Sequence, residues 1–115
     1  MNIPRHATVH SGQILASGNS DVVMLPTRDL IVVFDITAVQ GTLPTIDFVI
    51  EEFDPASGKF FALPAPAQIN SVSTVRHTIL AATNPFGPML RLSWTLGGTA
   101  TPGFTFTCSF MSMGA

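Results

Sequence analysis

The sequence has few charged side chains. Asp, Glu, Lys and Arg make up 10% of the 115 residues, whereas an average globular domain has about 25%. The five Lys and Arg residues are scattered, and the formal net charge of −2 leaves no basic stripe for nucleic-acid binding. Intrinsic disorder needs low hydropathy and high net charge, but 46% of these residues are hydrophobic. We therefore expect a folded domain with a largely neutral surface, of the kind that usually marks an interface.

Cysteine and long apolar runs are also scarce. Cys108 is the one cysteine, so no intrachain disulfide can form and no cysteine-based metal site is expected. The apolar runs, such as LIVVF at residues 30–34, are far too short for a membrane-spanning helix. The first residues, MNIPRHATVH, lack the apolar core of a secretion signal. These features predict synthesis in a cytoplasm and no membrane partner.

What the chain has in abundance is Val, Ile, Thr and Phe in short runs separated by Gly and Pro, which is typical of an all-β protein. We expect a single domain over residues 1–115, folded as an antiparallel sandwich of about eight strands, jelly-roll or immunoglobulin-like. TLGGTATPG, residues 95–103, is expected to form a hairpin connection between the last two strands. The predicted strands are Ala7–Ala16, Val22–Leu25, Leu30–Val39, Thr45–Phe53, Lys59–Leu63, a segment within Ile69–Leu80, Met89–Leu96 and Phe104–Phe110.

Four of the seven carboxylates fall in one stretch, DFVIEEFDPASGKFF, residues 47–61. DPASG has the residues of a tight turn, in which Asp54 would order the backbone. Glu51 and Glu52 would point to opposite faces of a strand, while Asp47 and Glu51 would share a face about 13 Å apart. That distance is too long for one metal ion or a paired acid and base. The pattern favours a structural hairpin, and weak calcium binding is the alternative.

The positions of the histidine, cysteine and tryptophan residues can be explained by structural roles, without a catalytic or binding function. His77 lies inside an alternating strand, and alternation allows His6 and His10 to share a face. Cys108 alternates with phenylalanines and Trp94 with leucines, which predicts core positions for both. No nucleophile elbow and no zinc-binding helix motif is present. We therefore expect no enzyme, no cofactor and no metal ligand.

The ends of the chain and one loop are the best candidates for docking. Residues 1–7 resemble an arm that becomes ordered against a partner. ATNPFGP, residues 82–88, predicts a long exposed loop with an aromatic tip, and FMSMGA, residues 110–115, is a soft and adaptable terminus. The residues predicted to contact a capsid or another subunit are Ile3, Arg5, His6, Phe86, Met111 and Met113.

Two stretches of the sequence resemble small virion proteins of tailed bacteriophages. The first is FDITAVQGTLPTIDFVIEEFDPASGKFFAL, with its DITAVQGT, PTID and DPASGK motifs. The second is RLSWTLGGTATPGFTFTCSF, with an Arg-x-x-Trp strand, a GGT turn and an aromatic final strand. Together they cover roughly residues 30–61 and 89–110. The motifs mark strands and turns, and the resemblance carries over no catalytic residue.

The resemblance implies a β-sandwich auxiliary head protein that binds the capsid exterior, often as a trimer. From it we expect a decoration or cement protein with two partners, the major capsid protein and further copies of itself, located on the phage head. Tail, neck or fibre components use similar sandwiches and remain an alternative. A carbohydrate-binding sandwich is another, for which Phe60, Phe61 and Phe86 are the candidate aromatic contacts.

Overall fold

The computed structural model describes residues 5–26 and 28–113, and this part of the chain is all-β with no helix. The expectation of an all-β antiparallel sandwich is confirmed. Every strand pair is antiparallel. The strands are β1 (His6–Ile14), β2 (Gly18–Asn19), β3 (Val23–Met24), β4 (Asp29–Asp54), β5 (Lys59–Ala62), β6 (Ser73–Ile79) and β7 (Met89–Met113).

β4 and β7 are unusually long, at 26 and 25 residues, whereas most strands have about 5–6. They pair with each other from Asp29 opposite Met113 to Glu52 opposite Leu90. The predicted strands Leu30–Val39 and Thr45–Phe53 are the two halves of β4, and the last two predicted strands are the halves of β7. Residues 95–103 therefore form a bend within one strand rather than the hairpin expected from the sequence, because both halves of β7 pair with β4 instead of with each other.

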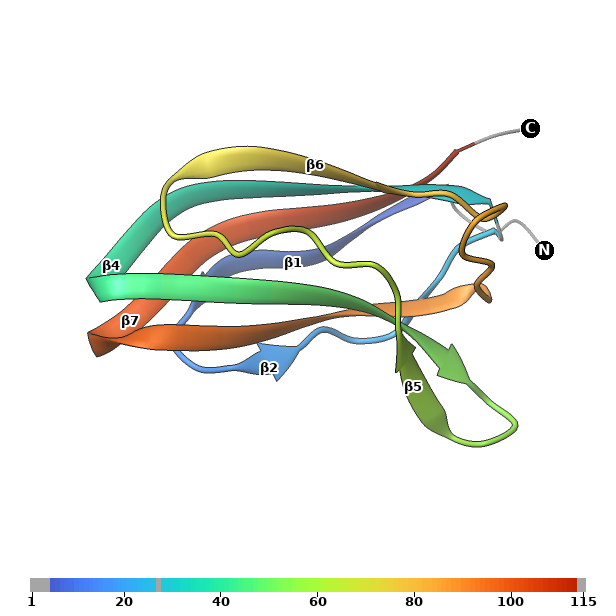
Figure 1. Ribbon diagram of the computed structural model, residues 1–115, viewed down its shortest axis with the longest axis horizontal. Helices are drawn as coiled ribbons and strands as arrows, with labels where there is room; N and C mark the ends of the chain where they lie inside the picture. The colour runs from blue at the N-terminus through green and yellow to red at the C-terminus, as the bar shows by residue number, and fades with distance from the viewer. Residues whose placement is uncertain (1–4, 27, 114–115) are drawn as a thin grey trace.

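The paired β4 and β7 bend together at one end of the molecule and fold back as a second layer (Figure 1). The first layer runs β1, the C-terminal half of β7, the N-terminal half of β4, then β6. The second layer runs β2 and β3, the N-terminal half of β7, the C-terminal half of β4, then β5. Each half of β4 and of β7 can be counted as a separate strand, and β2 and β3 as one interrupted strand. Numbered along the chain in this way, the strands lie in the order 1-8-3-6 in the first layer and 2-7-4-5 in the second. This is the strand order of a jelly roll, one of the two topologies expected.

The bend depends on backbone conformations that most residues avoid. Gly41 in β4 and Gly98 in β7 have φ angles of +100° and +112°, which only glycine adopts at little cost. Three other residues at the bend also have positive φ, namely Leu43, Ala100 and Thr101. A Cβ on Gly98 would lie 2.9 Å from the Cα of Pro44, and one on Gly41 would lie 2.8 Å from the Cα of Pro102. Glycine therefore lets the two strands turn while their backbones stay in contact.

Aromatic rings from both layers meet in the core between them. The rings of Phe34 and Phe48 stack with centroids 4.3 Å apart, and Phe48 meets Phe106 edge-on at 5.0 Å. Trp94 packs against Phe106 from the second layer, and its indole N–H donates to the carbonyl of Ala16 at 3.0 Å. Such pairs contribute about 0.5–1.5 kcal/mol each beyond area burial. The strict alternation seen in the sequence therefore reflects inward side chains from two facing layers.

β1 begins one residue earlier than expected, and its side chains alternate between the two faces of the sheet differently from the prediction. His6 and Ala7, the last residues of the predicted arm, belong to β1 and pair with β7. The register shifts between Thr8 and His10, so Val9 is an extra residue in a β-bulge. The bulge reverses the alternation and turns His10 inward, opposite Cys108, while His6 faces outward. His6 and His10 therefore do not share a face.

We predict that Gly98→Ala lowers the free energy of unfolding by about 2–5 kcal/mol. The positive φ costs about 1–2 kcal/mol for Ala, and the contact with the β4 backbone adds about 1–3 kcal/mol of overpacking. Gly58→Ala is the matched control, because Gly58 has φ +73° but nothing within 4 Å of an added Cβ. Urea unfolding of both variants measures the difference. Equal losses would show that the two strands can separate at the bend.

Candidate docking surface

Four of the predicted docking residues gather at one end of the first layer, near both chain termini. His6 lies directly opposite Met111, and Met113 follows two residues along β7. The backbone N–H of Ser112 donates to the carbonyl of Arg5 at 2.6 Å, so pairing continues to the residue before β1. The terminal corner, as we call this group, comprises Arg5, His6, Met111 and Met113.

The other two predicted residues do not join the terminal corner. Ile3 lies outside the described residues. Phe86 was expected at the tip of an exposed loop, but its side chain is only 6% exposed and packs in the core. The loop is held down because the backbone N–H of Gly87 donates to the Glu52 carboxylate at 2.7 Å. Phe86 is therefore a core residue, and no local sequence pattern indicates the distant carboxylate that holds its loop.

The outer face of the first layer has very few charges. Strand alternation places Ser, Thr, Met, Ile and Val side chains there, and the ionised ones are Asp29, Asp35 and Arg76. Asp35 accepts a hydrogen bond from the hydroxyl of Thr74 at 3.1 Å. The neutral face, as we call it, comprises His6, Thr8, Ser11, Gln13, Asp29, Ile31, Val33, Asp35, Thr74, Arg76, Thr78, Thr105, Thr107, Ser109, Met111 and Met113.

Apolar side chains concentrate where the neutral face meets the terminal corner. Met111 and Met113 are 43% and 40% exposed. Ile31 pairs with Met111 on one side and Thr78 on the other, and it is buried although it lies outside the core between the layers. A β-sheet face with exposed thioethers and few charges is suited to being covered by another protein surface.

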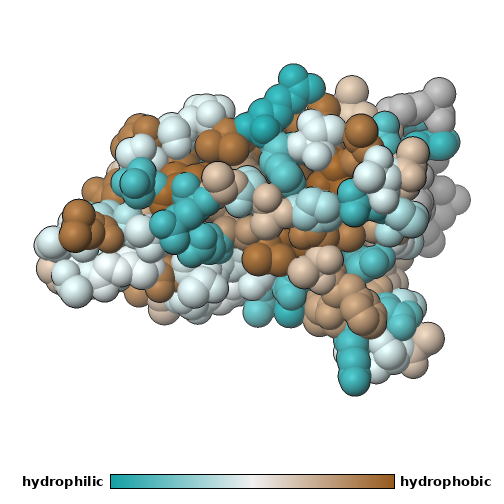
Figure 2. Space-filling model, viewed as in Figure 1, coloured by the Kyte–Doolittle hydropathy of each residue, from teal (hydrophilic) through white to brown (hydrophobic). Residues whose placement is uncertain are grey.

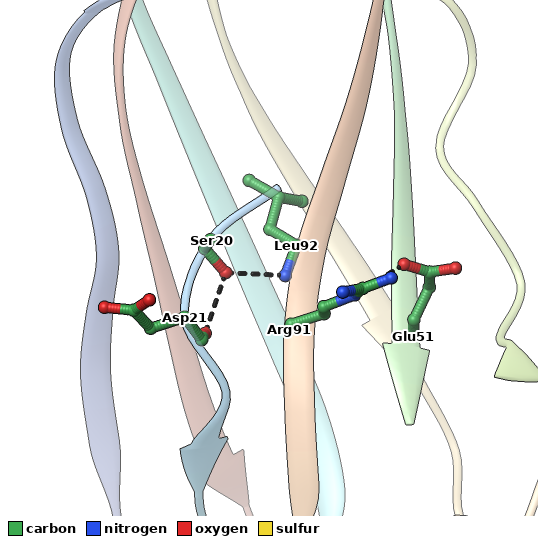
Figure 3. A network of polar contacts seen from close by, with 5 residues as sticks. All are labelled: Ser20, Asp21, Glu51, Arg91 and Leu92. Carbon is green, nitrogen blue, oxygen red and sulfur yellow. Dashed lines mark hydrogen bonds and ion pairs between the residues drawn. The ribbon is translucent and has the colours of Figure 1, made fainter. Parts of the chain in front are cut away.

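The outer face of the second layer has a different chemistry. Arg91 on β7 donates to Glu51 on β4 at 2.9 Å, in an ion pair across the two strands (Figure 3). The guanidinium of Arg91 also lies 3.4 Å from the centre of the Phe60 ring. In the same view the hydroxyl of Ser20 accepts from the backbone N–H of Leu92 at 2.9 Å. This face is therefore tied together by local polar contacts.

The acidic stretch that stood out in the sequence is accounted for by structural contacts. Asp47 accepts from the side-chain amide of Gln68 at 2.9 Å. Asp54 accepts a hydrogen bond from the backbone N–H of Ala56 at 3.1 Å. The pKa of Asp54 is lowered mainly by a hydrogen bond from the Ser57 hydroxyl and, to a smaller extent, by the one from Ala56. These contacts confirm the predicted turn. Within residues 5–26 and 28–113, no three His, Cys, Asp or Glu side chains come together in a metal-binding group.

The remaining candidate side chains lie in structural surroundings. Cys108 is fully buried, and this burial raises the pKa of its thiol. His10 stacks on Phe106 with ring centroids 4.3 Å apart. The Nε2 of His77 lies 2.8 Å from the carbonyl oxygen of Pro64. The positions expected for Cys108 and His77 are thus the ones observed.

A shallow cleft separates the projecting β4–β5 hairpin from the loop before β7. The hairpin extends from the body of the molecule at the lower right of Figure 2, where hydrophilic atoms are scattered among neutral and hydrophobic ones. Of the three aromatic residues considered for carbohydrate binding, Phe61 is exposed, Phe60 lies against Arg91 and Phe86 is buried. The cleft has a volume of about 360 Å³ and is lined by Glu52, Phe53, Asp54, Pro55, Phe61, Gly87, Pro88 and Met89.

Comparisons of the chain with protein-family models, curated proteins and solved structures gave no match. In the described part of the chain, no helix could cross a membrane. The fold and the surfaces described above are therefore the basis for inferring function.

We predict that Phe86→Ala lowers the free energy of unfolding by about 3–5 kcal/mol, because it leaves a cavity in the core. Phe61→Ala is the matched control, since Phe61 is 50% exposed and its loss should cost less than about 1 kcal/mol. Denaturant unfolding of the two variants provides the comparison. Similar small losses for both would place Phe86 at the surface, as the sequence suggested.

Proposed function

We propose that the chain is a structural virion protein that decorates or cements the exterior of a tailed-phage head and works as a homotrimer. The observation that carries this proposal is the neutral face, a four-stranded sheet surface whose ionised side chains are Asp29, Asp35 and Arg76. The cores of protein interfaces are depleted in charge in the same way. The resemblance of residues 30–61 and 89–110 to small phage virion proteins gives the proposal its biological setting.

The size of the molecule fits this role. Its extents of 44 × 28 × 26 Å give a broad face on the order of 1,000 Å², and a stable interface needs about 800 Å² from each partner. A protein that binds the assembled shell and not its free subunits stabilises the shell by mass action. Trimeric attachment would strengthen this effect, because the second and third contacts form at high effective concentration.

The test uses two serines of β7 in equivalent surroundings. Ser109 on the neutral face and Ser93 on the opposite face are both half-buried, and each lies directly opposite a valine of β4, Val33 and Val49 respectively. We predict that Ser109→Glu weakens trimer formation and capsid binding at least about tenfold, since it buries an unpaired charge. Ser93→Glu should leave both unchanged.

The measurements are sedimentation velocity of the purified chain and co-sedimentation with empty heads of the phage that encodes it. Wild-type protein that stays monomeric and does not sediment with heads would rule out the cement role. Binding of both variants at wild-type strength would show that the neutral face is not the interface. Binding to purified glycans, lost in Phe61→Ala, would favour the carbohydrate-binding alternative instead.

A further inference from the structure

The terminal corner brings together two thioethers and an imidazole. His6 and Met111 are direct cross-strand partners, which places their Cβ atoms about 4.5–5.5 Å apart. Met113 follows Met111 on the same face of β7, at a rise of about 6.8 Å for two residues of an antiparallel strand. His6 is exposed, and the two methionines are 43% and 40% exposed. The three side chains thus form a small triangle open to solvent.

The strands fix the backbone of this triangle, while the side chains can still converge. Met has three rotatable bonds, so both sulfur atoms can swing toward the imidazole. Between the methionines, the Ser112 side chain is buried and its hydroxyl donates to the carbonyl of Pro26 at 3.1 Å. Its backbone N–H donates to the carbonyl of Arg5. These bonds hold the end of β7 against the fold, as a ligand-binding strand requires.

The ligand atoms of this triangle, two thioether sulfurs and an imidazole nitrogen, favour a soft metal ion. Thioethers are neutral, polarisable ligands that favour Cu(I), whereas Ca²⁺ and Mg²⁺ require carboxylate or carbonyl oxygens. The nearest cross-strand carboxylate is that of Asp29, opposite Met113, and it already accepts the backbone N–H of Ala81 at 2.9 Å. Ile31 lies beside Met111 and gives the triangle an apolar side, which suits a cation of low charge.

We propose that His6, Met111 and Met113 bind one Cu(I) ion, with the two sulfur atoms and one imidazole nitrogen as ligands. This inference goes beyond the proposed virion function and does not rest on it. Two of its three ligands are methionine sulfur atoms, so the site differs in kind from a group of His, Cys, Asp and Glu side chains. Metal binding here would also join the start of β1 to the end of β7.

A second methionine pair provides an internal control. Met24 and Met89 are direct partners between β3 and β7, and Met24 is 41% exposed. No histidine pairs with either of them in the described sheet. Met89 is half-buried. If a cross-strand pair of methionines alone were sufficient, this pair would bind the ion as well as the terminal corner does.

The first experiment titrates the purified chain with Ag(I), which mimics Cu(I) and does not undergo redox changes under these conditions. The methyl signals of the methionines and the imidazole signals of the histidines are followed by NMR. We expect saturation at one equivalent, with shifts at Met111, Met113 and His6 and none at Met24 and Met89. Absence of shifts at the terminal corner, or equal shifts at both methionine pairs, would overturn the proposal.

The second experiment measures Cu(I) affinity in anaerobic competition with a chromophoric chelator. The double variant Met111→Leu/Met113→Leu keeps the side-chain size and should bind at least about tenfold more weakly. His6→Gln should also weaken binding, and Met24→Leu/Met89→Leu should not. Circular dichroism checks that the variants fold. Wild-type affinity in both terminal-corner variants would exclude the site, and the NMR titration tests it even if a variant fails to fold.

Discussion

β4 and β7 pair over nearly their full lengths, and every other strand in the described chain hydrogen-bonds to one of these two. β1, β2 and β3 attach to β7, while β5 and β6 attach to β4. Because both long strands bend at the same place, one pairing produces both layers and sets the distance between them. The core aromatics Phe34, Phe48 and Phe106 meet only because of this bend. The glycines at the bend are therefore as important to the fold as the core side chains.

Most of the carboxylates accept hydrogen bonds within the fold. Glu51 pairs with Arg91, Glu52 holds the loop that carries Phe86, and Asp54 orders the β4–β5 turn. These contacts lie on or beside the second layer, whereas the outer face of the first layer has few ionised side chains, namely Asp29, Asp35 and Arg76. The two layers thus differ in chemistry, one stabilised by local polar contacts and the other suited to being covered. This asymmetry is the physical basis for proposing an assembly role.

Sequence patterns predicted much of the local structure. The alternation in Leu90–Leu96 and Phe104–Phe110 correctly indicated which side chains face inward, and DPASG correctly indicated a turn. The predictions failed where distant segments determine the outcome. The inward turn of His10 depends on a bulge against β7, and the burial of Phe86 depends on a hydrogen bond between Gly87 and Glu52. Neither partner is close in sequence, so no local pattern could reveal them.

The sequence by itself determined the all-β class, the strand-forming segments, the hairpin turn and the shortage of charge, because these follow from residue preferences over a few positions. Only the tertiary structure decided that four predicted strands are the halves of two, that the order is a jelly roll, and that His6, Met111 and Met113 share one corner. The reason is that hydrogen-bond register joins residues that are far apart in the sequence, such as Glu52 with Leu90 and His6 with Met111. Backbone pairing and layer packing select among the arrangements that local preferences allow.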